Sequence, residues 1–179
     1  TLLALEPKVI GLGVYIWNVE ETTQLVAMLK VVAPQIRVVV GGPEVSHETT
    51  EQRIHDLADH VVTGQGDLAF NRLARVLLQG GTPETKILAG EVPDLAELKL
   101  PYAYYTDEDI ARRNLFVEAS RGCPFKCEFC LSSLDRTALP FPLERFLAEL
   151  ATLYERGART FKFVDRTFNL NVRSSLTIL

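Results

Sequence analysis

The chain has 179 residues and a formal net charge of −4 at pH 7, and 47% of its residues are hydrophobic. That apolar content can build a buried core, so an intrinsically disordered chain is excluded. The acidic balance and the lack of a basic stripe argue against a protein that binds nucleic acid non-specifically. No apolar run reaches the roughly 18 residues of a membrane-spanning helix, so we expect no membrane partner.

The first half of the sequence alternates short apolar runs with helical patterns. Strands are predicted at residues 9–16, 37–40 and 60–63, and helices are predicted after each of them. Such alternation is typical of parallel strands in an open α/β sheet, whose ligands bind at the carboxyl ends of the strands. Five glycines at those ends would either let a ligand approach the backbone or simply form tight turns: Gly13, Gly41, Gly42, Gly64 and Gly66.

A second α/β unit is predicted after a connecting segment. A strand over residues 115–119 leads into a cysteine-rich loop, a helix follows, and a strand over residues 160–164 ends in a polar loop. This order is typical of the first βα units of a TIM barrel, whose functional loops share one face. We therefore expect a domain at 1–92, a linker at 93–113 and an incomplete domain at 114–179. Both ends resemble interrupted elements, so a piece of a longer enzyme is expected.

All three cysteines of the chain, Cys123, Cys127 and Cys130, fall within one octapeptide. A C-x3-C-x2-C pattern on one loop brings three soft thiolates toward one point, as a metal centre requires. A structural zinc site needs a fourth ligand, and the nearest histidine, His60, lies far upstream. Three thiolates instead fit an iron–sulfur cubane with one iron open to an exogenous ligand. A zinc-binding module without enzymatic activity is the alternative interpretation.

The pattern Gly122-Cys123-x3-Cys127-x-Phe129-Cys130, after a barrel strand and before a helix, resembles the radical S-adenosylmethionine superfamily. The resemblance implies that the three cysteines hold a 4Fe–4S cluster whose fourth iron binds S-adenosylmethionine. Reductive cleavage of that molecule would give a 5′-deoxyadenosyl radical, which abstracts hydrogen from a small-molecule substrate. A reducing electron donor such as flavodoxin or ferredoxin is implied as a partner. The tight, odd-numbered cysteine cluster also fits a reducing, cytoplasmic compartment.

Other features resemble the branch of this superfamily that has an N-terminal cobalamin-binding domain. Residues 9–15, 38–44 and 63–66 are similar to the later strands of that domain, which implies that the five glycines lie against cobalamin. The polar loop Asp165-Arg-Thr-Phe-Asn169 replaces a common Gly-Gly-Glu motif, as this branch tends to show. The resemblance implies that Phe129, Asp165 and Asn169 contact S-adenosylmethionine.

The predicted fold class is therefore α/β: a flavodoxin-like (Rossmann-like) cobalamin-binding domain, truncated at its N-terminus, followed by the first βα units of a partial TIM barrel. The predicted function is reductive cleavage of S-adenosylmethionine, with cobalamin, for methyl transfer or rearrangement on an unknown substrate. A cobalamin-independent, methylthiotransferase-like enzyme is the alternative. The front domains of such enzymes contain their own cysteines, and residues 1–114 of this chain contain none.

Overall fold

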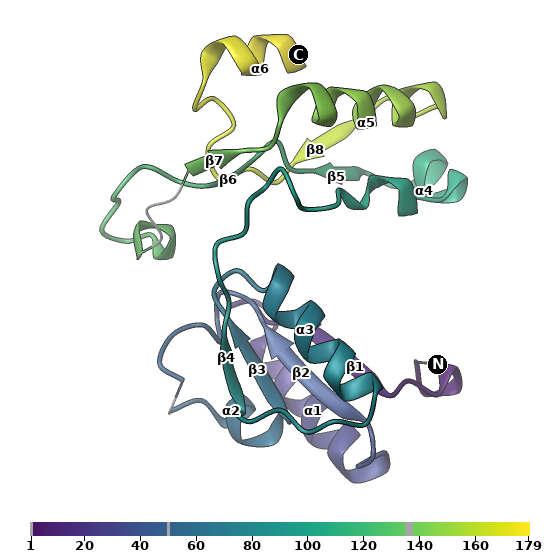
Figure 1. The fold of residues 1–179 in the computed structure, drawn as a ribbon, viewed down its shortest axis with the longest axis vertical. Helices are drawn as coiled ribbons and strands as arrows, with labels where there is room; N and C mark the ends of the chain where they lie inside the picture. Colours follow the sequence, from purple (N-terminus) through teal and green to yellow (C-terminus); the bar gives the residue numbers. More distant parts are fainter. Residues whose placement is uncertain (1, 50, 135–137) are drawn as a thin grey trace. The chain divides into compact units, whose positions relative to one another are not determined.

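The computed structural model describes residues 2–49, 51–134 and 138–179. The chain divides into two compact units, Thr1–Pro93 and Asp94–Leu179 (Figure 1). Every helix in the described part of the chain is too short or too polar to pass through a bilayer.

The first unit is a parallel sheet with helices on both faces. Its strands pair in chain order, β1-β2-β3-β4, and each pair is parallel. Parallel pairing brings the carboxyl ends of these strands to one edge of the sheet. The elements are η1 (Leu2–Leu5), β1 (Val9–Gly13), α1 (Val19–Val32), β2 (Arg37–Gly41), α2 (Arg53–Leu57), β3 (His60–Thr63), α3 (Asp67–Leu78) and β4 (Ile87–Ala89).

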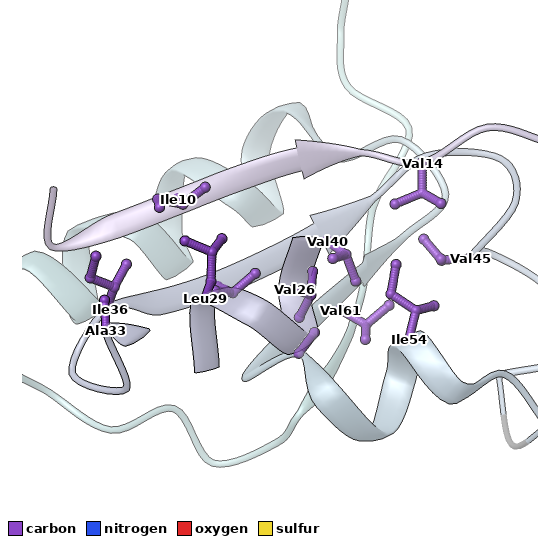
Figure 2. Packing of buried hydrophobic residues seen from close by; sticks show 12 residues of the cluster. Ile10, Val14, Val26, Leu29, Ala33, Ile36, Val40, Val45, Ile54 and Val61 are labelled. Atoms are coloured by element: carbon purple, nitrogen blue, oxygen red, sulfur yellow. The ribbon is translucent and has the colours of Figure 1, made fainter. Parts of the chain in front are cut away.

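The central strands of this sheet are buried on both faces because their apolar runs are continuous. Val38 and Val40 of β2 pack in one cluster with α1 and α2, whereas Val39 packs with Val62 and Leu73 on the side of α3 (Figure 1). Figure 2 shows the first cluster, in which side chains of the sheet meet those of both helices: Ile10, Val26, Leu29, Val40, Ile54 and Val61.

The structure corrects one prediction for this unit and adds one strand that was not predicted. The strand predicted over residues 9–16 ends at Gly13, because the next residues form a turn in which the Asn18 N–H donates to the Tyr15 carbonyl (3.0 Å). The strand β4 was not predicted, because three residues are too few to show a period of two. Its Ile87 pairs with Val61 of β3.

The second unit contains a two-stranded parallel sheet of β5 and β8 and an antiparallel pair of β6 and β7. Its core is formed by buried residues of η2, β5 and α5, among them Tyr102, Leu115 and Phe146. The elements are η2 (Pro101–Tyr104), α4 (Asp107–Arg112), β5 (Leu115–Val117), β6 (Ser120–Gly122), η3 (Leu131–Leu134), β7 (Ala138–Pro140), α5 (Leu143–Glu155), β8 (Phe161–Phe163) and α6 (Val172–Ile178).

Residues 94–113, most of the segment predicted as a linker, lie within this second unit. Here two tyrosine hydroxyls bond the backbone of β5 and its extension. Tyr102 Oη accepts from the Glu118 N–H (2.8 Å) and donates to the Glu118 carbonyl (3.3 Å), and Tyr105 does the same with Phe116 (3.0 and 2.9 Å). Burial raises the pKa of Tyr102 to about 12, so its hydroxyl stays protonated.

A partly buried ion pair joins α1 to the sheet. The Asp59 carboxylate accepts hydrogen bonds from Lys30 Nζ (2.8 Å), Arg37 Nη1 (3.3 Å) and the Val38 N–H (2.8 Å). Burial raises the pKa of Asp59, but the hydrogen bonds from Lys30 and Val38 and the charge of Lys30 outweigh burial, so the pKa lies below its usual value. The ionised carboxylate therefore stabilises the folded state.

We expect Asp59→Ala to lower the free energy of unfolding by about 2–3 kcal/mol at pH 7, because Lys30 loses its carboxylate partner. Since the folded pKa is depressed, this contribution is complete above the unfolded pKa of about 4 and is lost as the pH falls through the folded pKa. Urea unfolding of both proteins at several pH values measures it. Asp56→Ala, which changes an exposed carboxylate of α2, is the control and should change little. Equal losses in the two variants would contradict the assignment.

Candidate functional site

The first candidate site is the edge of the sheet at which β1, β2 and β3 end. Two of the five predicted glycines there have backbone conformations that favour glycine, since φ is +117° at Gly42 and +68° at Gly64. A Cβ on Gly42 would also lie only 2.5 Å from the carbonyl oxygen of Val14. The chain itself therefore requires glycine at position 42 and favours it at position 64, whether or not a ligand is bound.

The other three glycines differ in how much space surrounds them. A Cβ on Gly41 would lie 3.2 Å from the Val62 carbonyl oxygen, and one on Gly66 would lie 3.2 Å from Val62 Cγ1. A Cβ on Gly13 would meet only the Tyr15 ring, at an ordinary 3.5 Å. Gly13 is exposed, and its φ is not positive. Of the five, Gly13 is the one whose lack of a side chain is explained neither by local packing nor by a positive φ.

An exposed aromatic pair lies directly beyond Gly13. The rings of Tyr15 and Trp17 stack with their centroids 4.6 Å apart and their planes 9° from parallel, and Trp17 is 73% exposed. Asn18 holds this turn, because its Oδ1 accepts from the Tyr15 N–H (2.8 Å) and its Nδ2 donates to the Gly13 carbonyl (3.0 Å). Sequence reasoning missed this pair, because Tyr15 was included in the strand predicted over residues 9–16 and Trp17 lies just beyond it.

One serine joins the turns that follow β2 and β3. The Ser46 hydroxyl donates to the Gly42 carbonyl (2.7 Å), and its oxygen accepts from the Gly64 N–H (3.0 Å). The same loop is braced by Gln52, whose Nε2 donates to the carbonyls of Glu44 (2.8 Å) and His47 (3.1 Å). The two turns are thus fixed relative to each other by a side chain that the sequence analysis did not identify.

The second candidate site is the cysteine loop, which follows β6. The three cysteines lie on this one loop, no disulfide joins them, and the Cys130 N–H donates to the Cys127 carbonyl (3.0 Å). Among the described residues, no three His, Cys, Asp or Glu side chains are grouped closely enough to hold a metal ion. The three thiols therefore lie on one loop, but in this structure they are not close enough together to bind a common metal ion. Metal binding commonly completes such sites.

The loop after β8 contacts the start of the cysteine loop through Asp165. One carboxylate oxygen accepts from the Ala119 N–H (3.0 Å), and the other accepts from the Ser120 hydroxyl (2.7 Å). Ser120 is buried and Asp165 is half-buried, so these bonds are partly shielded from water. Sequence reasoning missed this structural role. Asn169 and Phe129 are both exposed, Phe129 to 94%, and the contact of all three with S-adenosylmethionine stays a prediction.

A pocket of about 610 Å³ lies between the β6–β7 pair, α5 and α6. Its lining includes Ser120, Phe141 and Phe168. Neither the three cysteines nor Asp165 and Asn169 are among the described residues that line it. The structure thus does not bring these predicted site residues together around this pocket.

We expect Asp165→Ala to lower the free energy of unfolding by about 2 kcal/mol, because it leaves the Ala119 N–H and the buried Ser120 hydroxyl without their acceptor. Asn169→Ala should change it by less than about 0.5 kcal/mol, because Asn169 is exposed. Urea unfolding followed by circular dichroism compares the two variants. Equal stability of Asp165→Ala and the wild type would show that the carboxylate does not brace the loop.

Residues 1–74 match the family described as the B12 binding domain. Over 97% of its length, the chain is 28% identical to the uncharacterized methyltransferase PH0819 of Pyrococcus horikoshii. Over 94% of its length, it is 25% identical to the cobalamin-dependent radical SAM methyltransferase TokK of Streptomyces tokunonensis. The chain spans 42% of the first relative and 28% of the second.

The fold is similar to that of the radical S-adenosylmethionine methyltransferase TsrM of Kitasatospora setae, solved with cobalamin and a [4Fe-4S] cluster bound. The TM-score is 0.68 at 15% identity, over 96% of this chain and 40% of TsrM. The predicted fold class is confirmed: a flavodoxin-like cobalamin-binding domain is followed by the first βα units of a barrel. In sequence and in fold, the chain is therefore similar to radical S-adenosylmethionine enzymes that have an N-terminal cobalamin-binding domain, which confirms the predicted resemblance.

Proposed function

We propose that the chain belongs to an enzyme that uses a 4Fe–4S cluster, S-adenosylmethionine and cobalamin to transfer a methyl group to a small-molecule substrate. The observation that carries this proposal is the pairing of two features in one chain. Three cysteines lie on a loop beyond the parallel strand β5, and the preceding unit matches a cobalamin-binding domain. Methyl transfer is favoured over rearrangement because the relatives compared above are methyltransferases.

The chemistry of the cysteine loop fits the cluster. Cys123, Cys127 and Cys130 supply three soft donors from one loop. A set of three leaves one iron open, whereas a structural zinc site would need a fourth protein ligand. When bound, the cluster would supply the electron that splits S-adenosylmethionine into methionine and a 5′-deoxyadenosyl radical. A flavodoxin or ferredoxin would deliver that electron.

The edge of the first unit fits a large, flat ligand such as cobalamin. The exposed Tyr15–Trp17 pair offers apolar surface beside the open position at Gly13. The turns at Gly42 and Gly64 would lie beside the ligand and are held together by Ser46. Bound cobalamin would carry the methyl group. The match of residues 1–74 to a cobalamin-binding domain counts against a cobalamin-independent, methylthiotransferase-like enzyme.

Protein reconstituted anaerobically with iron and sulfide should bind about four irons per chain and, when reduced, should cleave S-adenosylmethionine. Replacing Cys123, Cys127 and Cys130 together by alanine should abolish both, because the cluster loses all its protein ligands. Iron analysis and chromatographic detection of 5′-deoxyadenosine are the measurements. Stoichiometric zinc in place of iron, or cleavage by the triple variant, would refute the proposal.

Hydroxocobalamin added to the protein should remain bound through desalting, as judged by its visible spectrum. We expect Ser46→Ala to weaken this binding about tenfold, a loss of about 1.4 kcal/mol, because the turns at Gly42 and Gly64 lose their common partner. Ser175→Ala is the matched control, since Ser175 also makes two backbone hydrogen bonds but lies on α6 in the other unit. A wild-type protein that loses cobalamin on desalting would contradict the assignment of this edge.

A further inference from the structure

Three consecutive residues beyond β8 contact the cysteine segment at separate points. Asp165 binds its first part at Ala119 and Ser120. Arg166 Nη1 donates to the Ser132 hydroxyl, two residues past Cys130. Thr167 reaches the first cysteine, with its Oγ1 3.3 Å from the sulfur of Cys123. The segment is therefore held at three points: before its first cysteine, at that cysteine, and after its third cysteine.

The contact between Thr167 and Cys123 is the one that touches a thiol, and it is partly buried. Either atom can donate while Cys123 is a thiol. A cysteine that ligates iron is a thiolate and has no proton, so in the loaded protein the Thr167 hydroxyl must be the donor. Threonine suits this task because its branched Cβ restricts χ1, which keeps the hydroxyl aimed at the sulfur.

We propose that Thr167 is a positioning residue for the cluster, whose hydroxyl donates to the sulfur of Cys123 and raises the cluster's reduction potential. This inference rests on the proposed function. A hydrogen bond to a ligating sulfur stabilises the more negative, reduced cluster more than the oxidised one. Transfer of one electron from the donor to the cluster is therefore easier when this bond is present, and the proton stays on the hydroxyl throughout.

The test compares Thr167→Val, which keeps the shape but removes the hydroxyl, with Thr167→Ser, which restores it. Midpoint potentials of the reconstituted proteins are measured by redox titration followed by electron paramagnetic resonance. We expect the valine variant to bind as much iron as the wild type but to be reduced about tenfold less favourably, a shift of about 59 mV to more negative potential. The serine variant should return toward the wild-type value.

Thr152→Val is the matched control, because the Thr152 hydroxyl bonds only the Ala148 carbonyl among the contacts of α5 described here (3.0 Å). Its potential should equal that of the wild type. A wild-type potential in Thr167→Val, or an equal shift in Thr152→Val, would overturn the inference. A wild type that assembles no cluster would instead refute the proposed function, and this inference with it.

A second measurement tests the wild type by itself, so that its main result does not depend on how the variants fold. Electron–nuclear double resonance of the reduced wild-type cluster should reveal a coupled proton that disappears in D2O, because a hydroxyl proton next to a ligating sulfur exchanges with solvent. Thr167→Ser should keep this signal and Thr167→Val should lose it. A wild-type spectrum without such a proton would overturn the inference even if the valine variant bound no iron.

Discussion

Parallel pairing of strands is the constraint on which both candidate sites depend. In the first unit, pairing of β1 with β2 sets Gly13 beside Gly41, so the turns that follow these strands begin side by side. In the second unit, pairing of β5 with β8 sets Val117 beside Phe163. Two residues beyond the end of each strand lie Ala119 and Asp165, and the Ala119 N–H donates a hydrogen bond to the Asp165 carboxylate. Strand register thus determines which loop residues can meet.

Along β5 and its extension, two tyrosine side chains make the hydrogen bonds that a neighbouring strand would otherwise make. The Val117 carbonyl bonds the Val164 N–H on the side of β8, so the polar groups of Phe116 and Glu118 point to the opposite edge. There the hydroxyls of Tyr102 and Tyr105 each donate one hydrogen bond and accept another, as a neighbouring strand would. This satisfies a strand edge that would otherwise need water or another strand.

Features coded by local pattern could be predicted from the sequence, and contacts between distant residues could not. The strand at 37–40, the cysteine loop and the fold class follow from apolar runs, spacing and resemblance within short segments. The contact of Asp165 with Ser120 joins residues 45 positions apart, and no periodicity encodes it. Ser46 lies between two turns that are neighbours because β2 and β3 pair. The predicted contacts to S-adenosylmethionine and cobalamin stay predictions.

A prediction from residue type alone assigns too many residues to a cofactor, because the fold itself needs some of them. Gly42 is demanded by its positive φ and by the Val14 carbonyl, and both oxygens of Asp165 are engaged within the protein. Among the described residues, no comparable constraint acts on Gly13, Trp17 or Phe129, although Trp17 stacks on Tyr15. Two of these three expose most of a large aromatic side chain, which is unfavourable in water unless something covers it. Gly13, Trp17 and Phe129 are therefore better candidates for contact with a ligand than Gly42 or Asp165, which the fold itself requires.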